Sequence, residues 1–355
     1  MSTVVIAGGG TGGHLFPGLA VAMELRQAGV EITWLGARRG LEATRIPAAG
    51  FPIRLLAVTG AVGRSPLARV GAALRMAPAV LQAAAFLLRR RAGAVLSLGG
   101  YASLPGALAA ALLGVPVVLQ EQNARPGVAN RFLAPWASAI ACGFAEAVAA
   151  FPSLPAHWTG NPVRAEFFAV PAPPLDPLAV LVMGGSQGSA FLNRVMPLAF
   201  AASPGARPRI LHQAGPRWEE EVRQRYAEAG VAAEVVGFLE EPARALTLAA
   251  LVVARAGALT IAELAAARRA ALLVPFAAAA HAHQLANANA LAATGAAEVV
   301  EEAEATPPAL AAVLARLLAQ PEALIQRGQS GGRLARADAA TAVARMVREA
   351  AGGGR

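Results

Sequence analysis

The chain has no lysine, a single cysteine and few aromatic residues. All 31 of its basic residues are arginine, and its 355 residues include only 12 phenylalanines and 2 tyrosines. One cysteine, Cys142, excludes an internal disulfide framework and is typical of a reducing compartment. The sequence also lacks zinc-ligand spacing and any RNA-binding signature. With so few aromatic residues, it predicts no nucleic-acid partner.

The net charge of the chain indicates what kind of partner it binds, whereas its high apolar content does not indicate a membrane protein. A net charge of +9 favours anionic partners such as a membrane surface or a phosphorylated ligand. Alanine supplies much of the 56% hydrophobic content, so that figure does not indicate a membrane protein. Glycine and proline interrupt the long uncharged run 94–120, which predicts a strand at 94–98, a helix at 105–113 and a strand at 115–119 rather than a membrane span. Because a strand begins at Val4, we expect no signal peptide.

Short apolar runs alternate with longer helical patterns, which is typical of parallel sheets with right-handed crossovers. Four prolines within residues 170–177 predict a stiff connection, with a domain boundary near residues 162–178. The candidate strands form two series, which predict two doubly wound domains. The first series is Val4–Ala7, Ile32–Leu35, Ile53–Leu56, Val95–Leu98, Pro116–Leu119 and Ala139–Ala141. The second is Ala179–Met183, Arg209–Gln213, Ala233–Val236, Leu251–Ala254, Ala271–Val274 and Glu298–Val300.

Two glycine-rich turns carry the main functional signal. The turn Gly8–His14 follows the first strand of the first series, and Gly184–Gly188 follows the first strand of the second. A glycine turn between a strand and a helix N-terminus presents backbone N–H groups and the positive end of the helix dipole to an anion. Two such turns in separate halves therefore predict two phosphate-bearing ligands.

The first turn leaves more than one interpretation open. The glycine spacing in Gly8–Gly13 matches the dinucleotide fingerprint, but the second strand does not end in the acid that an NAD site requires. Arg38 and Arg39 follow that strand and would suit the extra phosphate of NADP. His14 is unusual in such a loop, where the helix dipole lowers the pKa of an imidazole and favours its neutral, basic form. A histidine that only caps the turn is the alternative.

The second half carries polar residues that suit a sugar nucleotide. Glu263 lies in the helix that begins after Gly257, where a carboxylate can accept hydrogen bonds from both hydroxyls of a ribose. Gln284 and Asn287 share one helix face, and their carboxamides suit sugar hydroxyls. The histidine pair within 281–283 has no Asp or Cys nearby, so the sequence predicts no metal site.

These features belong to a set of motifs that occur in order along the chain. The set comprises Gly9–Ala20, Gly99–Tyr101, Glu121–Asn123, Gly160–Arg164, Gly184–Gly188, Arg255–Glu263, Val274–Phe276, and Gln284 with Asn287. Together they resemble the MurG family, the GlcNAc transferases that make lipid II from lipid I in peptidoglycan synthesis. The resemblance covers about residues 4–300.

The resemblance implies the α/β GT-B fold, in which two Rossmann-like domains with doubly wound parallel sheets face each other across a cleft. Residues 1–163 would form the acceptor and membrane-associating domain, joined by a C-terminal helix at 337–351. Residues 164–336 would form the UDP-GlcNAc-binding domain.

The implied reaction is an inverting transfer of GlcNAc from UDP-GlcNAc to the MurNAc 4-hydroxyl of undecaprenyl-diphospho-MurNAc-pentapeptide, or lipid I, with no metal or cofactor. The enzyme would be cytoplasmic and peripheral on the inner face of the cell membrane, with cell-wall synthesis or division proteins as candidate partners.

Roles for individual residues follow from the family positions. In the donor site, the backbone of Leu239 would contact uracil, Glu263 the ribose, and Gln284 and Asn287 the GlcNAc. Other donor residues would be Arg164, Ser186 and Gln187 at the diphosphate, with Ala258 and Leu259. The acceptor set would be Gly10, Thr11, Gly12, Gly13, Tyr101 and Asn123. For the general base we favour His14, with Glu121 as the second candidate.

The chain departs from the family pattern at three places. The family's histidine before Glu-Gln-Asn is Gln120 here, so that position cannot supply a base. The serine after Arg255 is Ala256, which removes one hydroxyl near the nucleotide. The paired glutamines of the donor loop appear as His283 and Gln284.

The segment 64–75 is the predicted membrane contact, because it combines an apolar stripe with basic residues on a helix that starts at Ser65-Pro66. The alternative is a helix packed on the domain core. The predicted contact residues are Leu67, Arg69, Val70, Leu74 and Arg75.

Other functions remain open at this point. An NADP oxidoreductase would explain only the first glycine turn, and a non-catalytic sugar- or lipid-binding module would not explain His14. Sister GT-B functions, such as a glycolipid synthase or a UDP-GlcNAc 2-epimerase, are harder to separate by physical reasoning.

Overall fold

The computed structural model describes residues 3–38, 40–58, 66–185, 187–205, 207–277 and 283–353, and only the backbone of residues 66–75. The chain divides into two compact units. One comprises Met1–Val163 with Arg336–Arg355, and the other comprises Arg164–Ala335. The proline-rich stretch at 170–177 lies within the second unit, where the Arg269 guanidinium donates a hydrogen bond to the Pro171 carbonyl.

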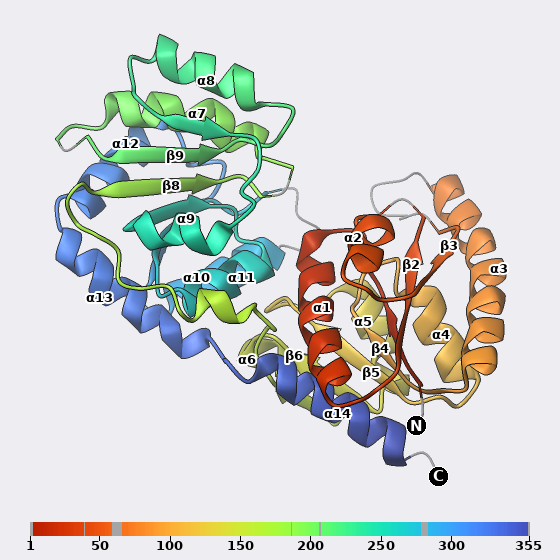
Figure 1. Cartoon of the computed structure of the whole chain (residues 1–355). Coiled ribbons are helices and arrows are strands. Elements are labelled where there is room, and N and C mark those ends of the chain that lie inside the picture. The colour runs from red at the N-terminus through yellow and green to blue at the C-terminus, as the bar shows by residue number, and fades with distance from the viewer. Residues whose placement is uncertain are drawn as a thin grey trace. The chain divides into compact units, whose positions relative to one another are not determined.

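The first unit is built on a parallel sheet whose strands lie in the order β3-β2-β1-β4-β5-β6-β7 (Figure 1). Its strands are β1 (Thr3–Ala7), β2 (Ile32–Ala37), β3 (Ile53–Leu56), β4 (Ala92–Ser97), β5 (Val117–Glu121), β6 (Ala139–Cys142) and β7 (Ala156–Trp158). Its α-helices are α1 (Gly12–Gln27), α2 (Glu42–Ala48), α3 (Pro66–Arg90), α4 (Leu104–Leu112), α5 (Val128–Leu133), α6 (Ala145–Val148) and α14 (Ala339–Gly353), with a 3-10 helix η1 (Ala134–Trp136).

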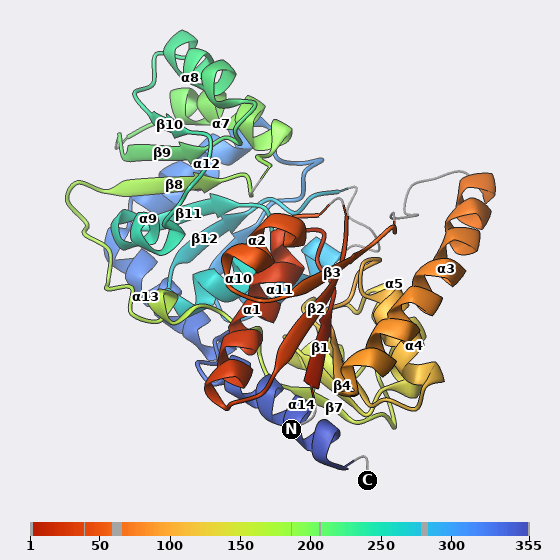
Figure 2. The ribbon, with the colours of Figure 1, turned by 45° about the vertical axis from the view of Figure 1, so that its right-hand side comes forward.

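The second unit repeats this plan with the order β10-β9-β8-β11-β12-β13 (Figure 2). Its strands are β8 (Ala179–Met183), β9 (Arg209–Gln213), β10 (Glu234–Val236), β11 (Leu251–Ala254), β12 (Ala270–Leu273) and β13 (Ala297–Val299). Its helices are α7 (Ala190–Ala202), α8 (Glu219–Glu228), α9 (Pro242–Leu248), α10 (Ala258–Ala266), α11 (His283–Ala292), α12 (Pro307–Leu318) and α13 (Pro321–Gly331), with 3-10 helices η2 (Ala165–Phe167) and η4 (Gly332–Leu334).

The α/β class and the two parallel sheets are confirmed. All twelve predicted strands are present, each within three residues of its predicted ends. The strand that the sequence analysis missed is β7, which has only three residues, none of them fully buried, and so lacks the apolar run that marks a buried strand. The uncharged run 94–120 holds the predicted strand, helix and strand in that order.

The helix α14 returns the C-terminal end of the chain to the first unit. It lies against α1 (Figure 1), buries Val343 and Val347 in the core on that side of the sheet, and is joined to α1 by a 2.9 Å hydrogen bond from Thr341 to Glu24. The helices α3 and α4 pack together over the other core.

Both sheets reverse their strand order between two neighbouring strands, β1 with β4 and β8 with β11. Ligands of open α/β sheets bind beyond the carboxyl ends of strands at such reversals. The turn Gly8–His14 follows β1, and Gly99 follows β4; Gly184–Gly188 follows β8, and Arg255 follows β11. The fold therefore brings the predicted site motifs of each unit to one edge of its sheet.

Among the described residues, no single helix has the length and apolar content needed to cross a membrane. The helices in 307–318 and 321–353 pass such a test only as a pair, and they are bent by 95°.

Candidate active site

The glycine turn of the first unit encloses a buried carboxylate that the sequence analysis did not single out. Glu42, fully buried at the start of α2, accepts hydrogen bonds from the Gly10 N–H at 2.7 Å and the Ala37 N–H at 2.9 Å. A Cβ on Gly9 would lie 2.2 Å from the Glu42 Cδ, and one on Gly40 would lie 2.0 Å from Oε2. A side chain on either glycine would therefore displace the Glu42 carboxylate from its position.

This arrangement corrects part of the prediction for the first turn. The Gly10 N–H, which we expected to face a ligand, is already paired with an internal carboxylate. A buried negative charge next to the turn also disfavours a bound pyrophosphate, as a dinucleotide site would require. The amides of Gly12 and Gly13 in the first turn of α1 make no backbone hydrogen bond within the described residues.

His14 lies in the first turn of α1, where Thr11 is the N-cap residue. Its Nδ1 is 3.1 Å from the Thr11 hydroxyl oxygen. Burial lowers the pKa of His14, and the nearby carboxylates of Glu121 and Glu42 oppose that effect. His14 is therefore neutral at neutral pH. A Cβ on Gly100 would lie 3.6 Å from the His14 Nε2, so this glycine leaves the space beside that nitrogen free of a side chain.

Glu121 ends β5 and is almost completely buried. Its Oε1 accepts hydrogen bonds from the Asn123 backbone and side chain, at 2.8 and 3.1 Å. Its Oε2 accepts hydrogen bonds from the Gly127 N–H and the Asn130 side chain, both at 2.9 Å. Four donors on one carboxylate fix the loop that follows β5, and they leave Glu121 poorly suited to take a proton from a substrate.

The predicted residue Tyr101, and Gln120 at the position where the family has histidine, belong to the same unit. The Tyr101 ring covers Gly10, with its Cε1 3.5 Å from the position of a Cβ there. Burial raises the pKa of Tyr101, and the charge of Glu42 acts in the same direction. Gln120, which replaces the family's histidine, is buried, and within the described residues neither polar atom of its carboxamide has a hydrogen-bond partner.

The glycine turn of the second unit is tightly packed. A Cβ on Gly188 would lie 1.8 Å from the Ala214 carbonyl oxygen, and one on Gly184 would lie 2.5 Å from the Ser189 nitrogen. Ser189 is the N-cap of α7, where its hydroxyl accepts a hydrogen bond from the Leu192 N–H at 3.3 Å. Gln187 is exposed on the turn. Ser186, the other predicted residue of this turn, lies outside the described residues.

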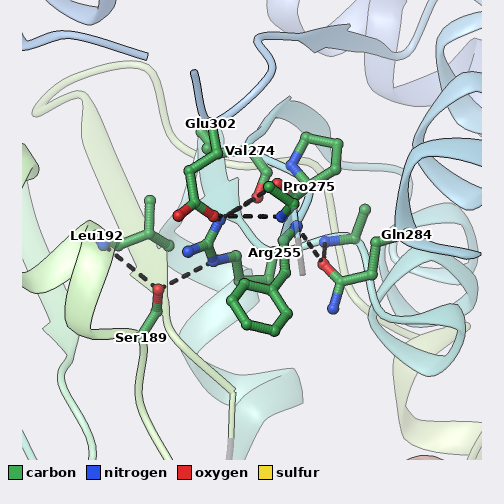
Figure 3. Close-up of polar contacts among 10 residues, drawn as sticks. Ser189, Leu192, Arg255, Val274, Pro275, Gln284 and Glu302 are labelled. Atoms are coloured by element: carbon green, nitrogen blue, oxygen red, sulfur yellow. Dashed lines mark hydrogen bonds and ion pairs between the residues drawn. The ribbon is translucent and has the colours of Figure 1, made fainter. Parts of the chain in front are cut away.

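Arg255 connects this turn to the ends of two neighbouring strands (Figure 3). Its Nε donates a hydrogen bond to the Ser189 hydroxyl at 3.0 Å, and its Nη1 lies 2.7 Å from the Glu302 Oε2. The same Nη1 also donates to the carbonyls of Val274 and Pro275, at 3.0 and 3.3 Å. Burial lowers the pKa of Arg255, whereas the charge and the hydrogen bond of Glu302 raise it.

The carboxamides of α11 bind the turn after β11. The Gln284 Oε1 accepts hydrogen bonds from the Phe276 N–H at 2.9 Å and the Ala256 N–H at 3.2 Å. Asn287, which is fully buried, donates to the Ala256 carbonyl at 3.2 Å. We expected both carboxamides to face a sugar, but each also contributes a hydrogen bond to the backbone of Ala256.

Glu263 lies in α10 and is partly buried. Burial raises its pKa to about 7; the charge of Arg164 opposes this rise and that of Glu166 adds to it. Arg164 itself forms a 3.0 Å ion pair with Glu166 and lies over the Phe167 ring. Ala258 and Leu259 form the first turn of the same α10, after the N-cap Gly257.

Some predicted positions remain without a structural account. Leu239 is partly exposed in the loop after β10. The side chains of Leu67, Arg69, Val70, Leu74 and Arg75 lie outside the description, which gives only their backbone in α3. In the part of the chain that the structure describes, no group of three or more His, Cys, Asp or Glu side chains is arranged to hold a metal ion.

Comparison with known proteins identifies the family. The N-terminal domain model of glycosyltransferase family 28 matches residues 4–142, and the C-terminal domain model matches residues 179–343. Relatives from Stutzerimonas stutzeri (strain A1501) and Halorhodospira halophila (strain DSM 244 / SL1) are each 44% identical to the chain, and each alignment covers 99% of both sequences. Both are named UDP-N-acetylglucosamine--N-acetylmuramyl-(pentapeptide) pyrophosphoryl-undecaprenol N-acetylglucosamine transferase. The chain belongs to the MurG group of glycosyltransferase family 28.

A solved MurG structure supports the same assignment. The crystal structure of MurG from Acinetobacter baumannii matches with a TM-score of 0.81 and 31% identity, over 98% of this chain and 100% of that one. The predicted MurG resemblance, GT-B fold class and glycosyltransferase activity are thereby confirmed. The roles of individual residues stay predictions.

Proposed function

We propose that this MurG-family chain transfers GlcNAc from UDP-GlcNAc to the MurNAc 4-hydroxyl of undecaprenyl-diphospho-MurNAc-pentapeptide, with inversion at the anomeric carbon. The observation that carries the proposal is the near-complete match to relatives named for this transfer. Each unit has a candidate site where its strand order reverses. In this proposal the site of the first unit supplies a base, and that of the second unit supplies hydrogen-bond donors for the leaving diphosphate.

In this proposal His14 is the general base. With its Nδ1–H donating to the Thr11 hydroxyl, its Nε2 is unprotonated and takes the proton of the acceptor hydroxyl. The acceptor oxygen forms a bond to the anomeric carbon as the bond from that carbon to the UDP oxygen breaks, and UDP leaves with the electron pair. The carboxylates of Glu121 and Glu42 stabilise the imidazolium that forms.

Glu121 has a different role in this scheme. Because four donors already occupy its carboxylate, it positions the loop with Asn123 rather than acting as the base. The acceptor would then meet Tyr101, Asn123 and the first-turn amides of α1 at Gly12 and Gly13.

The second unit would hold the donor. Within the predicted turn 184–188, the Gly184 and Gly188 N–H groups already donate to the carbonyls of Gln213 and Gly185. Arg164, Gln187 and the other amides of the turn, that of Ser186 among them, would therefore bind the diphosphate and stabilise its developing charge. Glu263 would accept hydrogen bonds from the ribose hydroxyls, and the backbone of Leu239 would contact uracil. Ala258 and Leu259 would add the N-terminus of α10, and Gln284 and Asn287 would position the GlcNAc.

We further propose that the enzyme works at the inner face of the membrane, because its acceptor is attached to a lipid. In the described part of α3, Leu81 and Leu88 have exposed side chains. Arg89, Arg90 and Arg91 follow them and are exposed as well. An apolar surface next to basic side chains suits an anionic membrane surface, and it continues the predicted contact at 67–75.

The test is transfer of labelled GlcNAc from UDP-GlcNAc to a soluble lipid I analogue. A labelled disaccharide supports the proposal. Titration with UDP and with NADPH separates it from an oxidoreductase, since the transferase binds UDP alone. Binding of UDP-GlcNAc without any product would favour a non-catalytic module or another acceptor, and formation of the 2-epimer of UDP-GlcNAc would favour an epimerase.

A further inference from the structure

One mostly buried cation, Arg255, joins its own segment after β11 to three other segments of the second unit. The Arg255 side chain, 12% exposed, contacts Ser189 at the start of α7, the carbonyls that follow β12, and Glu302 after β13. Its guanidinium also lies 5.2 Å from the Phe191 ring centroid and 5.4 Å from that of Phe276. Such a cation needs an anionic partner, because burying an unpaired charge is costly.

Glu302 supplies that partner and makes a second contact. Its Oε2 lies 2.7 Å from the Arg255 Nη1 and accepts a 3.4 Å hydrogen bond from the Ala277 N–H. Its side chain is 23% exposed. A single carboxylate thus joins the end of β11 to the backbone that leaves β12.

The contacts continue from Arg255 to both parts of the candidate donor site. Through Ser189, Arg255 fixes the first turn of α7, directly after the glycine turn. Through the backbone at 274–276, it is linked to Gln284, which binds the Phe276 and Ala256 amides. Figure 3 shows Arg255 between Ser189 and Glu302, with Gln284 on the neighbouring segment.

We propose that Glu302 is a positioning residue of the donor site. It holds Arg255 against Ser189 and against the backbone after β12, and so fixes the glycine turn 184–188 relative to the turn 255–257. Its contribution to donor binding rests on the function proposed above, whereas its effect on these two turns is a property of the protein without ligand.

Three variants of the full-length protein test this role. Glu302→Ala removes the carboxylate, and Glu302→Gln keeps an oxygen that can accept hydrogen bonds from Arg255 and Ala277 without the charge. Glu304→Gln changes an exposed glutamate two residues away and serves as the matched control.

The first measurement is amide hydrogen exchange of the ligand-free proteins. In Glu302→Ala we expect faster exchange at the start of α7, at the Leu192 amide, and at the Ala256 and Phe276 amides, with β8 and β11 unchanged. Glu302→Gln should lie between Glu302→Ala and wild type, and Glu304→Gln should match wild type.

The second measurement is UDP binding by calorimetry together with transfer kinetics. Glu302→Ala should weaken UDP binding and raise the KM for UDP-GlcNAc about tenfold, which corresponds to the loss of one charge-assisted hydrogen bond in a preorganised site. The kcat should change less than twofold, because the residue does not touch the reacting atoms. Glu302→Gln should recover most of the affinity.

The outcomes separate the two proposals. Wild-type exchange at these amides and wild-type UDP affinity in Glu302→Ala would overturn the positioning role. A large fall in kcat together with a raised KM and faster exchange throughout the protein would also overturn it, because that pattern indicates a structural defect. A wild-type protein that binds UDP but transfers no GlcNAc would contradict the proposed function, and the UDP affinities of the variants would still decide the role of Glu302.

Discussion

Replacing Glu263 by glutamine should stabilise the protein at neutral and alkaline pH and leave its stability at acid pH unchanged. Burial raises the pKa of the Glu263 carboxyl from the ordinary 4.5 to about 7. The folded protein therefore keeps a proton that the unfolded chain releases at lower pH. Stability then falls as the pH rises from about 4.5 to about 7, and the full cost is present above that range.

The pKa values set the size of this cost. One pKa unit corresponds to about 1.4 kcal/mol, so the rise from 4.5 to about 7 makes the ionised carboxylate of Glu263 cost about 3.5 kcal/mol of unfolding free energy well above pH 7, of which about 1 kcal/mol is already present at pH 5. Glutamine has nearly the same shape and carries no charge at any pH, so Glu263→Gln removes the cost without leaving a cavity.

Urea unfolding of the wild type and of Glu263→Gln at pH 5 and pH 8 measures the effect. We expect the variant's advantage in unfolding free energy to be about 2 to 3 kcal/mol larger at pH 8 than at pH 5. Glu304→Gln, at an exposed position, should show no such change. A difference between Glu263→Gln and wild type that is the same at both pH values would refute the reasoning.

Three further predictions concern other sites. His14→Ala should lower kcat about 100-fold or more and retain UDP affinity; near-normal turnover by this variant would exclude His14 as the base. Because burial lowers the pKa of His14, wild-type activity should decline on the acid side with a midpoint below pH 6.5. His212 lies in β9, fully buried between Tyr226 and Asn193. Burial lowers its pKa to about 3, so wild-type stability should fall as the pH drops from about 6.5 towards 3, and unfolding curves of His212→Gln should lack this dependence. Charge reversal at Arg69 and Arg75 should weaken flotation with anionic liposomes and spare transfer to a soluble acceptor; unchanged flotation would place the membrane contact elsewhere.

The strands could be predicted because of how parallel sheets are buried. Strands covered on both faces are apolar on both faces, so β4 and the part of β5 before Glu121 appear as continuous uncharged runs. The short strand β7 has no such run, and the sequence offers no signal for it. The glycine turns could be located because the fold needs close backbone approach after β1 and β8.

The roles of the charged residues Glu42 and Glu302 could not be predicted, because most of their partners are distant in the sequence. Glu42 starts a short helix, where a glutamate is usually solvated, and nothing local distinguishes it. The signal is indirect, since Gly9, Gly36 and Gly40 all leave room for its side chain. Glu302 stands in a run with two exposed glutamates, and its role depends on Arg255, 47 positions earlier.

The two units share one strand order, but they place different charged residues next to their glycine turns. In the first unit, the buried Glu42 carboxylate accepts a hydrogen bond from the Gly10 N–H of the glycine turn, and burial lowers the pKa of the nearby His14. In the second unit, Arg255 lies behind the glycine turn and is neutralised by Glu302. In the proposed function, the first site accepts a proton and the second binds the anionic diphosphate.

The measurement that tests the central claim most directly is the structure of the product. The protein is incubated with UDP-GlcNAc, a soluble lipid I analogue and excess chelator, and the product is analysed by NMR. The account predicts a β-linked GlcNAc on the 4-oxygen of MurNAc, formed at a rate that the chelator does not change. An α linkage, attachment at another hydroxyl, or no product despite bound UDP-GlcNAc would contradict it.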